Sequence, residues 1–416
     1  MTTINHINNI NHINNINHIN NINENKAWHK ECAYAYFWET APGIGSATIE
    51  KIFELYGSYQ KMYEALEDEK IYHSLGLCEK MSEFKQRKKT LIKNHFMDWN
   101  VNLRYQEMIG QHIFCIPRFL NGYPHKLREI DKAPSALFVK GKLPEENRPL
   151  VAIIGARNCS NYGVHMAKEL GQVLAMHGIG VVSGLARGID GIGQLAALNE
   201  GGATFGILGS GVDVCYPPEN IELYKRLANS ENRGGIISEM PPGTQAEKNF
   251  FPMRNRIISG LADAIIVVEA KEKSGSFITV ERALEQGKDV YACPGRMCDS
   301  LSIGCNRLIS QGAGVIWNLD EFVQEVYQNH GFHININQDT TVSRIEDDQG
   351  KNTLPLTPIR QVIYNCLDYN MQPVDRILER VMEKHEILLK DLLIELSDME
   401  RLGYVRQENG FYGLAP

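Results

Sequence analysis

The 416-residue chain lacks the sequence features of a membrane protein and those of a zinc-binding protein. No apolar run is long enough to span a bilayer, and no signal peptide opens the chain. Its nine cysteines form no C-x-x-C pair and no Cys/His set with the spacing of a zinc site. These absences predict a cytoplasmic protein with free thiols, no metal site and no other cofactor.

An overall positive charge is also missing. The formal net charge is −7, so no global field attracts nucleic acid to this chain. Any site for an anion must therefore be a local patch of basic side chains and backbone amides.

The N-terminal residues 1–26 contain little that can form a core. Residues 4–22 repeat the unit Ile-Asn-His-Ile-Asn-Asn, which predicts a disordered low-complexity tail. Metal binding by His6, His12 and His18 is the alternative.

Residues 27–110 have apolar side chains at the three- and four-residue spacing of helices. The turn Pro42–Gly45 is predicted to open a helix at Ser46. It resembles a helix-hairpin-helix, in which such a turn offers backbone N–H groups to a DNA phosphate. A plain connection between two packed helices explains the turn equally well.

Residues 111–328 change to short β-rich runs that alternate with helical segments. Most runs are apolar throughout, as strands buried on both faces must be. This alternation predicts a doubly wound, mostly parallel α/β sheet. A proline-punctuated connector over 115–143 precedes it, with one short strand at Leu137–Val139. The predicted strands are Leu150–Gly155, Ile179–Ser183, Ala203–Leu208, Gly235–Ser238, Ala264–Glu269, Asp289–Cys293 and Gly314–Trp317.

A polar linker over residues 329–353 separates the sheet from the C-terminal part. Residues 354–416 begin with helical spacing and end in two short β-like runs around Asn409-Gly410, which predicts a winged-helix-like module. Its last helix mixes acidic with basic residues, so contact with protein and contact with duplex DNA are equally good interpretations.

Glycine, serine and cations follow the predicted strands of the sheet. In a doubly wound sheet, ligands bind outside the carboxyl ends of the strands. Glycine lets backbone N–H groups approach an anion, and helix N-termini add a positive dipole. We therefore expect a phosphate-binding rim at this edge. The cations expected to converge there are Arg157, Arg187, Lys248, Arg254 and Arg256.

The fingerprints of common nucleotide sites are absent from this rim. No G-x-G-x-x-G follows the first strand, and no G-x-x-x-x-G-K-[ST] occurs. Among the acidic residues, Asp190 is interpreted as a helix cap. Asp213 and Glu239 are interpreted as residues that order loops.

At this point the motifs resemble those of the DNA-processing protein A (DprA/Smf) family. The likeness extends over about Trp28–Val326. Its motifs are long and keep their order: GARNCSNYG, SGLARGID, ALNEGGATFGILGSGVDVCYPPEN, ISEMPPG, FPMRNRIISGLADAIIVVEA, SGSFIT, CPG and GCNRLISQGA.

The resemblance implies an extended Rossmann-like sheet domain, flanked by an N-terminal helical (helix-hairpin-helix/SAM-like) domain and a C-terminal winged-helix-like domain. It implies a protein, not an enzyme, that binds and protects single-stranded DNA. Such a protein loads a RecA-type recombinase in natural transformation and recombination, and is generally a homodimer.

Carried over by position, the resemblance also implies the residues that meet DNA. Phe251 would contact a base and Asn255 would order the turn. Phosphates would meet Gly155, Arg157, Ser183, Gly184, Arg187, Gly209, Gly211, Lys248, Arg254, Arg256, Ser274, Gly275 and Ser276.

Four positions depart from the family pattern. Gln194 stands where many members carry histidine, and Ala246 where proline is common. Phe277 and Val280 replace the usual leucine and alanine of the S-G-S loop. These departures put local packing in doubt.

Two other readings of the rim stay open. A phosphoribohydrolase would need a P-G-G-x-G-T signature, and the nearest sequence is CPGR at residues 293–296. Alternatively, Arg254 and Arg256 would pair with carboxylates and hold loops together. The DNA-binding reading predicts that alanine at both arginines abolishes binding without unfolding the protein.

Overall fold

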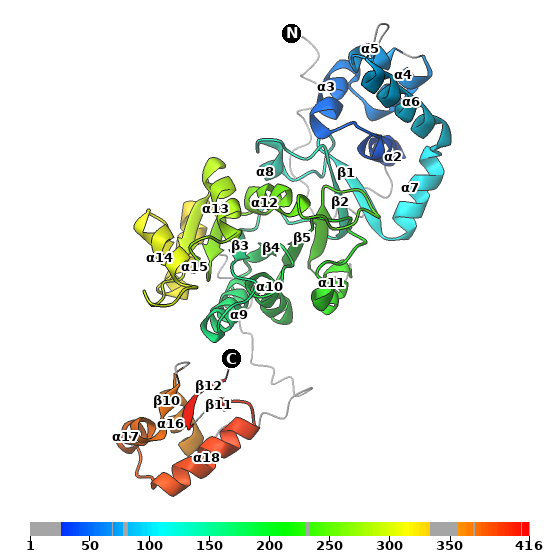
Figure 1. Cartoon of the computed structure of the whole chain (residues 1–416). Helices are drawn as coiled ribbons and strands as arrows, with labels where there is room; N and C mark the ends of the chain where they lie inside the picture. Colours follow the sequence, from blue (N-terminus) through cyan, green and yellow to red (C-terminus); the bar gives the residue numbers. More distant parts are fainter. Residues whose placement is uncertain are drawn as a thin grey trace. The chain divides into compact units, whose positions relative to one another are not determined.

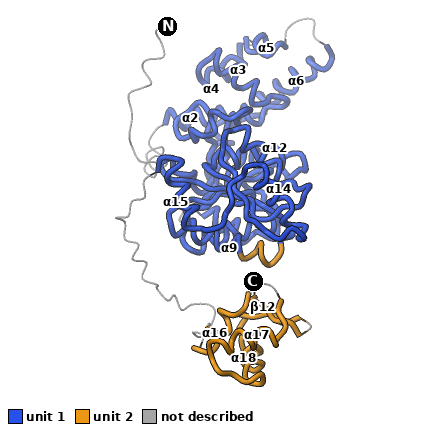
Figure 2. Tube along the Cα trace, turned by 90° about the vertical axis from the view of Figure 1, so that its left-hand side faces the viewer, with its two compact units in different colours: residues 1–159, 166–333 blue, residues 160–165, 334–416 orange. Residues whose placement is uncertain are grey.

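A computed structural model describes residues 26–68, 70–77, 82–229, 233–332, 357–368, 371–408 and 410–415. The chain forms two compact units, residues 1–159 with 166–333 and residues 160–165 with 334–416 (Figure 2). The histidine repeat and nearly all of the predicted linker lie outside the described residues. Within them, no helix is long and apolar enough to cross a membrane.

The N-terminal part of the first unit is helical, as its apolar spacing predicts. Its core is aromatic, with Phe37, Trp38 and Tyr59 fully buried. The predicted turn Pro42–Gly45 joins the first two helices, and Gly43 there has a φ of +70° that favours glycine. The helices are α2 (Lys26–Thr40), α3 (Ser46–Tyr56), α4 (Tyr59–Glu67), α5 (Ile71–Ser74), α6 (Glu83–Asp98) and α7 (Val101–Gly110).

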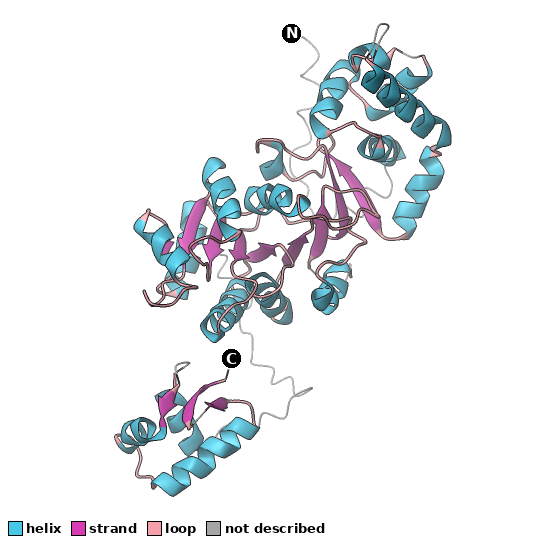
Figure 3. Ribbon diagram, viewed as in Figure 1, coloured by secondary structure: helices cyan, strands magenta, loops and turns pink. Residues whose placement is uncertain are grey.

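A nine-stranded sheet forms the rest of the first unit (Figures 1 and 3). The predicted strands all form, most of them shorter than predicted because their last residues already belong to the loops that follow. The strands are β1 (Ile113–Pro117), β2 (Ala136–Gly141), β3 (Leu150–Ile154), β4 (Gly180–Ser183), β5 (Thr204–Ile207), β6 (Gly235–Ser238), β7 (Ala264–Val267), β8 (Asp289–Ala292) and β9 (Gly314–Val315).

One strand was not predicted. Strand β1 pairs with β2 at the edge of the sheet, and it was not predicted because the prolines of this segment are typical of a connector. An edge strand tolerates Pro117 as its last residue because a missing N–H there breaks no central ladder.

The order of the sheet is β1-β2-β6-β5-β4-β3-β7-β8-β9. Strand β2 pairs antiparallel with β1 and β6, and all other neighbours are parallel. The order runs outward from β3 in both directions, so the chain reverses its course between β3 and β7. That reversal is the switch point at which doubly wound sheets bind ligands.

Helices cover both faces of this sheet (Figure 3). Leu150, Ala152 and Ile154 of β3 pack in one cluster with α12, α13 and α14, while Val151 and Ile153 pack in another with α9, α10 and α15. Alternate side chains of a strand point to opposite faces, so a strand apolar throughout fills both cores. The helices are α8 (His125–Arg128), α9 (Asn161–Met176), α10 (Ile189–Asn199), η1 (Pro218–Asn220), α11 (Ile221–Ala228), α12 (Phe250–Leu261), α13 (Ser276–Glu285), α14 (Ile303–Ser310) and α15 (Leu319–Asn329).

Within its described residues, the second unit has three helices and a small antiparallel sheet in the order β10-β12-β11, and the winged-helix-like module stays a prediction. Its core holds Ile363, Ile377 and Leu396, all fully buried. Asn409 of the predicted turn lies outside the described residues, and the predicted boundary between residues 27–110 and 111–328 stays a prediction. The elements are α16 (Pro358–Cys366), β10 (Gln372–Pro373), α17 (Val374–Met382), α18 (Leu389–Arg401), β11 (Val405–Glu408) and β12 (Phe411–Leu414).

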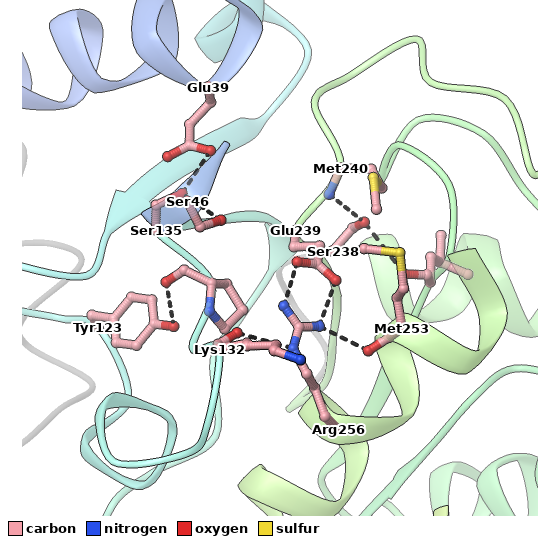
Figure 4. Close-up of polar contacts among 12 residues, drawn as sticks. Glu39, Ser46, Tyr123, Lys132, Ser135, Ser238, Glu239, Met240, Met253 and Arg256 are labelled. Atoms are coloured by element: carbon pink, nitrogen blue, oxygen red, sulfur yellow. Dashed lines mark hydrogen bonds and ion pairs between the residues drawn. The ribbon is translucent and has the colours of Figure 1, made fainter. Parts of the chain in front are cut away.

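A buried carboxyl lies where α2 meets the segment before β2. Glu39 Oε2 accepts a hydrogen bond of 3.0 Å from the Ser135 hydroxyl (Figure 4). Its Oε1 is buried and has no hydrogen-bond partner among the described residues. Burial raises the pKa of Glu39 from the ordinary 4.5 to about 8, and the Glu239 charge adds to this rise, against the Ser135 hydrogen bond.

Glu39→Gln is therefore expected to stabilise the protein at alkaline pH. Because the pKa of Glu39 is higher in the folded chain, folding takes up a proton between about pH 4.5 and 8, and the stability contributed by the protonated acid is lost as pH rises through that range. Glutamine stays neutral, so its advantage should be largest near pH 9 and vanish below about pH 4.5. Urea unfolding across this range measures the difference. The exposed Glu54→Gln is the control, and equal pH profiles for the Glu39 variant and the parent would refute the assignment.

Candidate nucleic-acid interface

The loops that leave β3 and β7 lie side by side at the switch point. The Ser276 hydroxyl donates a hydrogen bond of 3.2 Å to the carbonyl of Gly155, and Ser274 Oγ lies 3.2 Å from Ser276 Oγ. Gly275 is exposed, and a β carbon added there would meet nothing within 4 Å. The Ser274–Ser276 loop therefore presents the N-terminus of α13 to solvent beside the end of β3.

The structure places Arg254 inside the protein rather than on the rim. Its side chain is 5% exposed, and its Nη1 donates to the carbonyls of Gly184, at 2.6 Å, and Ile207. Its Nε donates to Asn255 Oδ1 at 3.2 Å. Burial lowers the pKa of Arg254 to about 10, while the Asp190 carboxylate opposes that shift. The expectation that Arg254 faces phosphate is corrected here, because the first turns of α12 point this side chain under the loops.

Arg256 is likewise engaged within the protein (Figure 4). Its Nη1 and Nη2 each lie 2.6 Å from a carboxylate oxygen of Glu239, and the two side chains are only 12% and 10% exposed. Its remaining donors bond the carbonyls of Lys132 and Met253. The fork-to-fork geometry satisfies the guanidinium. For Arg256, the alternative reading of an arginine that pairs with a carboxylate and holds a loop is therefore the one the structure supports.

Asp190 does not cap its helix. It is the second residue of α10, it is 7% exposed, and it accepts a hydrogen bond of 3.2 Å from the Gly184 N–H. Burial raises its pKa, against the Arg254 charge and the hydrogen bonds of Ser183, Gly184 and Gly155. Asp190 and Arg254 thus both bond the backbone of Gly184 and hold the loop after β4 in place.

Asp213 orders a loop, as predicted. Both of its carboxylate oxygens accept hydrogen bonds from the Gly243 N–H, at 2.8 and 2.9 Å. The carboxylate therefore ties the loop after β5 to the loop after β6.

Several predicted phosphate contacts are also internal. The Ser183 hydroxyl is fully buried and donates to the carbonyl of Ile153 at 2.6 Å. A β carbon at Gly184 would clash with the Arg254 guanidinium, and one at Gly155 would lie 2.7 Å from Ile189 Cγ1. These glycines are needed because neighbouring groups approach their backbones closely.

Gly209 and Gly211 belong to the same group. A β carbon at Gly209 would lie 3.3 Å from Phe251 Cδ1, and one at Gly211 would lie 2.8 Å from the carbonyl of Pro241. Both residues are buried. The small size of Gly209 lets the loop after β5 pack against the start of α12, and that of Gly211 lets it pack against the loop after β6.

Three predicted cations do reach the surface. Arg157, Arg187 and Lys248 are exposed. Arg187 makes an ion pair of 3.3 Å with Glu219, and more than half of each side chain is exposed. Such a pair stabilises little in water, so a phosphate can replace the carboxylate.

The partly exposed ring of Phe251 lies beside Arg157. The Arg157 guanidinium carbon is 6.0 Å from the Phe251 ring centroid, and that of Arg254 is 5.8 Å away. The Tyr216 ring, 43% exposed, lies 5.3 Å from Phe251 at 41°. Sequence reasoning missed Tyr216, although it follows the same glycine loop in GSGVDVCY. We call Arg157, Tyr216, Phe251 and the exposed Lys248, which comes just before α12, the exposed rim.

Gln194 shows how one departure from the family pattern is accommodated. Its amide oxygen accepts from the Leu185 N–H at 3.1 Å, and its Nε2 donates to the Phe205 carbonyl at 2.9 Å. Leu185 has a φ of +54°, which is rare for a residue with a side chain. The fully buried glutamine therefore fixes the loop after β4, and the doubt about packing at this position is removed.

Known proteins share the region that carries these loops. Residues 115–327 match the model of the family described as DNA recombination-mediator protein A. DNA processing protein DprA of Streptococcus pneumoniae is 44% identical over 203 residues, which are 49% of this chain and 71% of that protein.

A solved structure of 33% sequence identity agrees with this match. The X-ray structure of DNA processing protein A from Streptococcus pneumoniae is 33% identical, covers 70% of this chain and 97% of its own, and has a TM-score of 0.57. A structure of DNA processing protein A from Helicobacter pylori, described for the single-stranded DNA binding mode of that protein, is 29% identical. It covers 51% of this chain and 96% of its own, with a TM-score of 0.46.

Proposed function

Because the chain belongs to the DNA recombination-mediator protein A family, we propose that it binds single-stranded DNA on the exposed rim. The observation that carries the proposal is the placement of two rings, Phe251 and Tyr216, beside the exposed Arg157 at the carboxyl edge of the sheet. Rings that stack bases and cations that follow the backbone are the two components of a single-strand site.

The rim favours an unpaired strand over a duplex. In a duplex the base faces are stacked on one another, so Phe251 and Tyr216 have nothing to stack on. An unpaired strand exposes those faces, while Arg157 and Lys248 neutralise its phosphates. The amides of the Ser274–Ser276 loop, at the start of α13, add donors for a further phosphate.

We extend the proposal to the biological role. The nucleotides bound on the rim would be protected. The DNA strand would then be passed to a RecA-type recombinase during transformation or recombination. A homodimer and a cytoplasmic location belong to the same proposal, which rests on family membership.

We propose no catalytic step. Two acids near the rim are engaged within the protein, Asp190 beside Arg254 and Glu239 with Arg256. Release of free base from a nucleotide would contradict this part of the proposal.

The ring at position 251 gives a direct test. Phe251→Ala is expected to weaken binding to an oligothymidylate by about tenfold or more, because stacking of one base contributes about 1–3 kcal/mol. Phe251→Trp should retain most of the affinity. Fluorescence anisotropy with a labelled oligonucleotide measures both. Phe411→Ala in the second unit, where the ring is 44% exposed, is the matched control. Equal affinity of Phe251→Ala and the parent would remove Phe251 from the site.

A further inference from the structure

Helix α6 carries the densest positive charge of the helical part. Between Glu83 and Asp98 the sequence has five lysines and arginines against two acidic residues. Ile92 is the one residue of this 16-residue helix that is buried. Most of α6 therefore stays in contact with solvent, and its charge forms a local patch on a chain that is negative overall.

Helical spacing brings rings and cations together on one side of α6. Phe84, Arg87, Lys88 and Leu91 stand at positions i, i+3, i+4 and i+7, which share a face. Phe84 is 78% exposed and Leu91 is 45% exposed, and Arg87 between them is exposed as well. We call these four residues the α6 face.

The cations of the α6 face are available to a ligand. Neither Arg87 nor Lys88 has an ion pair within the described residues. By contrast, the ammonium groups of Lys89 and Lys93, on another side of the helix, lie 4.6 and 5.6 Å from the centroid of the Tyr72 ring.

Lys88 connects this face to the turn before α3. A β carbon at Gly43 would lie 3.5 Å from Lys88 Cε, so the lysine chain runs along the backbone of that turn. The turn Pro42–Gly45 contains no acidic side chain that would neutralise the ammonium. The positive charge therefore lies over a neutral, glycine-lined surface.

We infer that the α6 face is a second binding surface for single-stranded nucleic acid. An exposed phenylalanine one helical turn from two cations has the chemistry of a stacking platform, with Arg87 and Lys88 for the phosphates and Phe84 for a base. The inference rests on the proposed function only for the choice of ligand.

Other ligands fit this surface less well. Insertion into a membrane surface needs a continuous apolar stripe, and this face offers two apolar residues, Phe84 and Leu91. An acidic protein would meet Arg87 and Lys88 but would not require a ring that is 78% exposed.

The test uses the full chain and measures binding of oligothymidylate by fluorescence anisotropy. In a background with Arg157→Ala and Lys248→Ala, which weakens the rim, a residual salt-dependent affinity is expected to remain. Adding Arg87→Glu with Lys88→Glu should lower that residual affinity by about tenfold or more, since two phosphate contacts become repulsive. Phe84→Ala should lower it by several-fold, and Phe84→Trp should restore it.

Controls separate the possible failures. Lys51→Glu with Lys61→Glu places the same charge change on exposed positions of α3 and α4 and should leave affinity unchanged. If the α6 variants match this control while the rim variants lose binding, the inference is wrong and the proposed function stands. If the rim variants bind like the parent, the proposed function fails independently. Binding of the parent, and not the Arg87/Lys88 variant, to anionic phospholipid vesicles without any effect on DNA would assign the face to membranes instead.

Discussion

Arg157→Ala together with Lys248→Ala is expected to lower the affinity for single-stranded DNA by about 100-fold. Both side chains are exposed, and Arg157 lies 6.0 Å from the Phe251 ring centroid. A phosphate contact through a charged donor contributes roughly 1.5–3 kcal/mol, and each 1.4 kcal/mol is tenfold in affinity. Both losses together make this the largest effect expected on binding.

The salt dependence should change in parallel. Each lost phosphate contact reduces the slope of log affinity against log salt by about 0.7 for a single strand, so the double variant should lose about 1.4. Titrations of a labelled oligothymidylate at several salt concentrations measure both quantities. Because the two residues are exposed, the unfolding midpoint should stay within experimental error of the parent.

A matched pair controls for the loss of two positive charges. Lys168→Ala with Arg282→Ala removes the same charges from an exposed position in the middle of α9 and a half-exposed position in the last turn of α13. That variant should bind nearly as the parent does. An equal loss of affinity in both double variants would mean that net charge, and not the rim, determines binding.

Arg254→Ala is expected to have the largest effect on stability, lowering the free energy of unfolding by about 3–5 kcal/mol. The guanidinium is 5% exposed and bonds the carbonyls of Gly184 and Ile207. Its removal leaves both carbonyls and the buried Asp190 carboxyl without their cation. Urea unfolding monitored by tryptophan fluorescence and circular dichroism measures the loss.

The comparison with exposed residues makes this prediction specific. Lys248→Ala, only six positions earlier in the chain, should leave stability within about 0.5 kcal/mol of the parent. Any loss of DNA binding in Arg254→Ala should follow the loosening of the loops after β4 and β5. If Arg254→Ala were as stable as the parent and yet did not bind DNA, Arg254 would be a direct contact. The expectation that alanine at Arg254 and Arg256 spares the fold is therefore replaced by an expected loss of stability, because Arg254 is buried and Arg256 is paired with Glu239.

Neighbouring residues at the N-terminus of α12 are therefore expected to have different roles, some in DNA binding and others in stability. Phe251 is part of the rim, Arg254 lies beneath it, and Arg256 pairs with Glu239 beside it. Removal of either arginine is expected to lower DNA binding through loss of stability, and removal of a rim residue through loss of a contact, so a parallel stability measurement distinguishes the two.

The sequence by itself determined the class of fold and the family. Strands apolar throughout, alternating with helices, are sufficient for a doubly wound sheet, because both faces of a parallel sheet must be covered. Long ordered motifs such as SGLARGID identify the family, and the match over residues 115–327 confirms it. The edge strand β1 escaped prediction because its proline resembles those of a connector.

The role of each cation was decided only by the tertiary structure. Arg157, Arg254 and Arg256 are the same amino acid, and each follows a strand at the same edge of the sheet. Their environments differ because the carbonyls that accept from Arg254 come from residue 184, in the loop after β4, and from residue 207, at the end of β5. The carboxylate that holds Arg256 comes from residue 239. No local pattern shows which buried acceptors a guanidinium will meet, since those acceptors are brought together only when the sheet has formed.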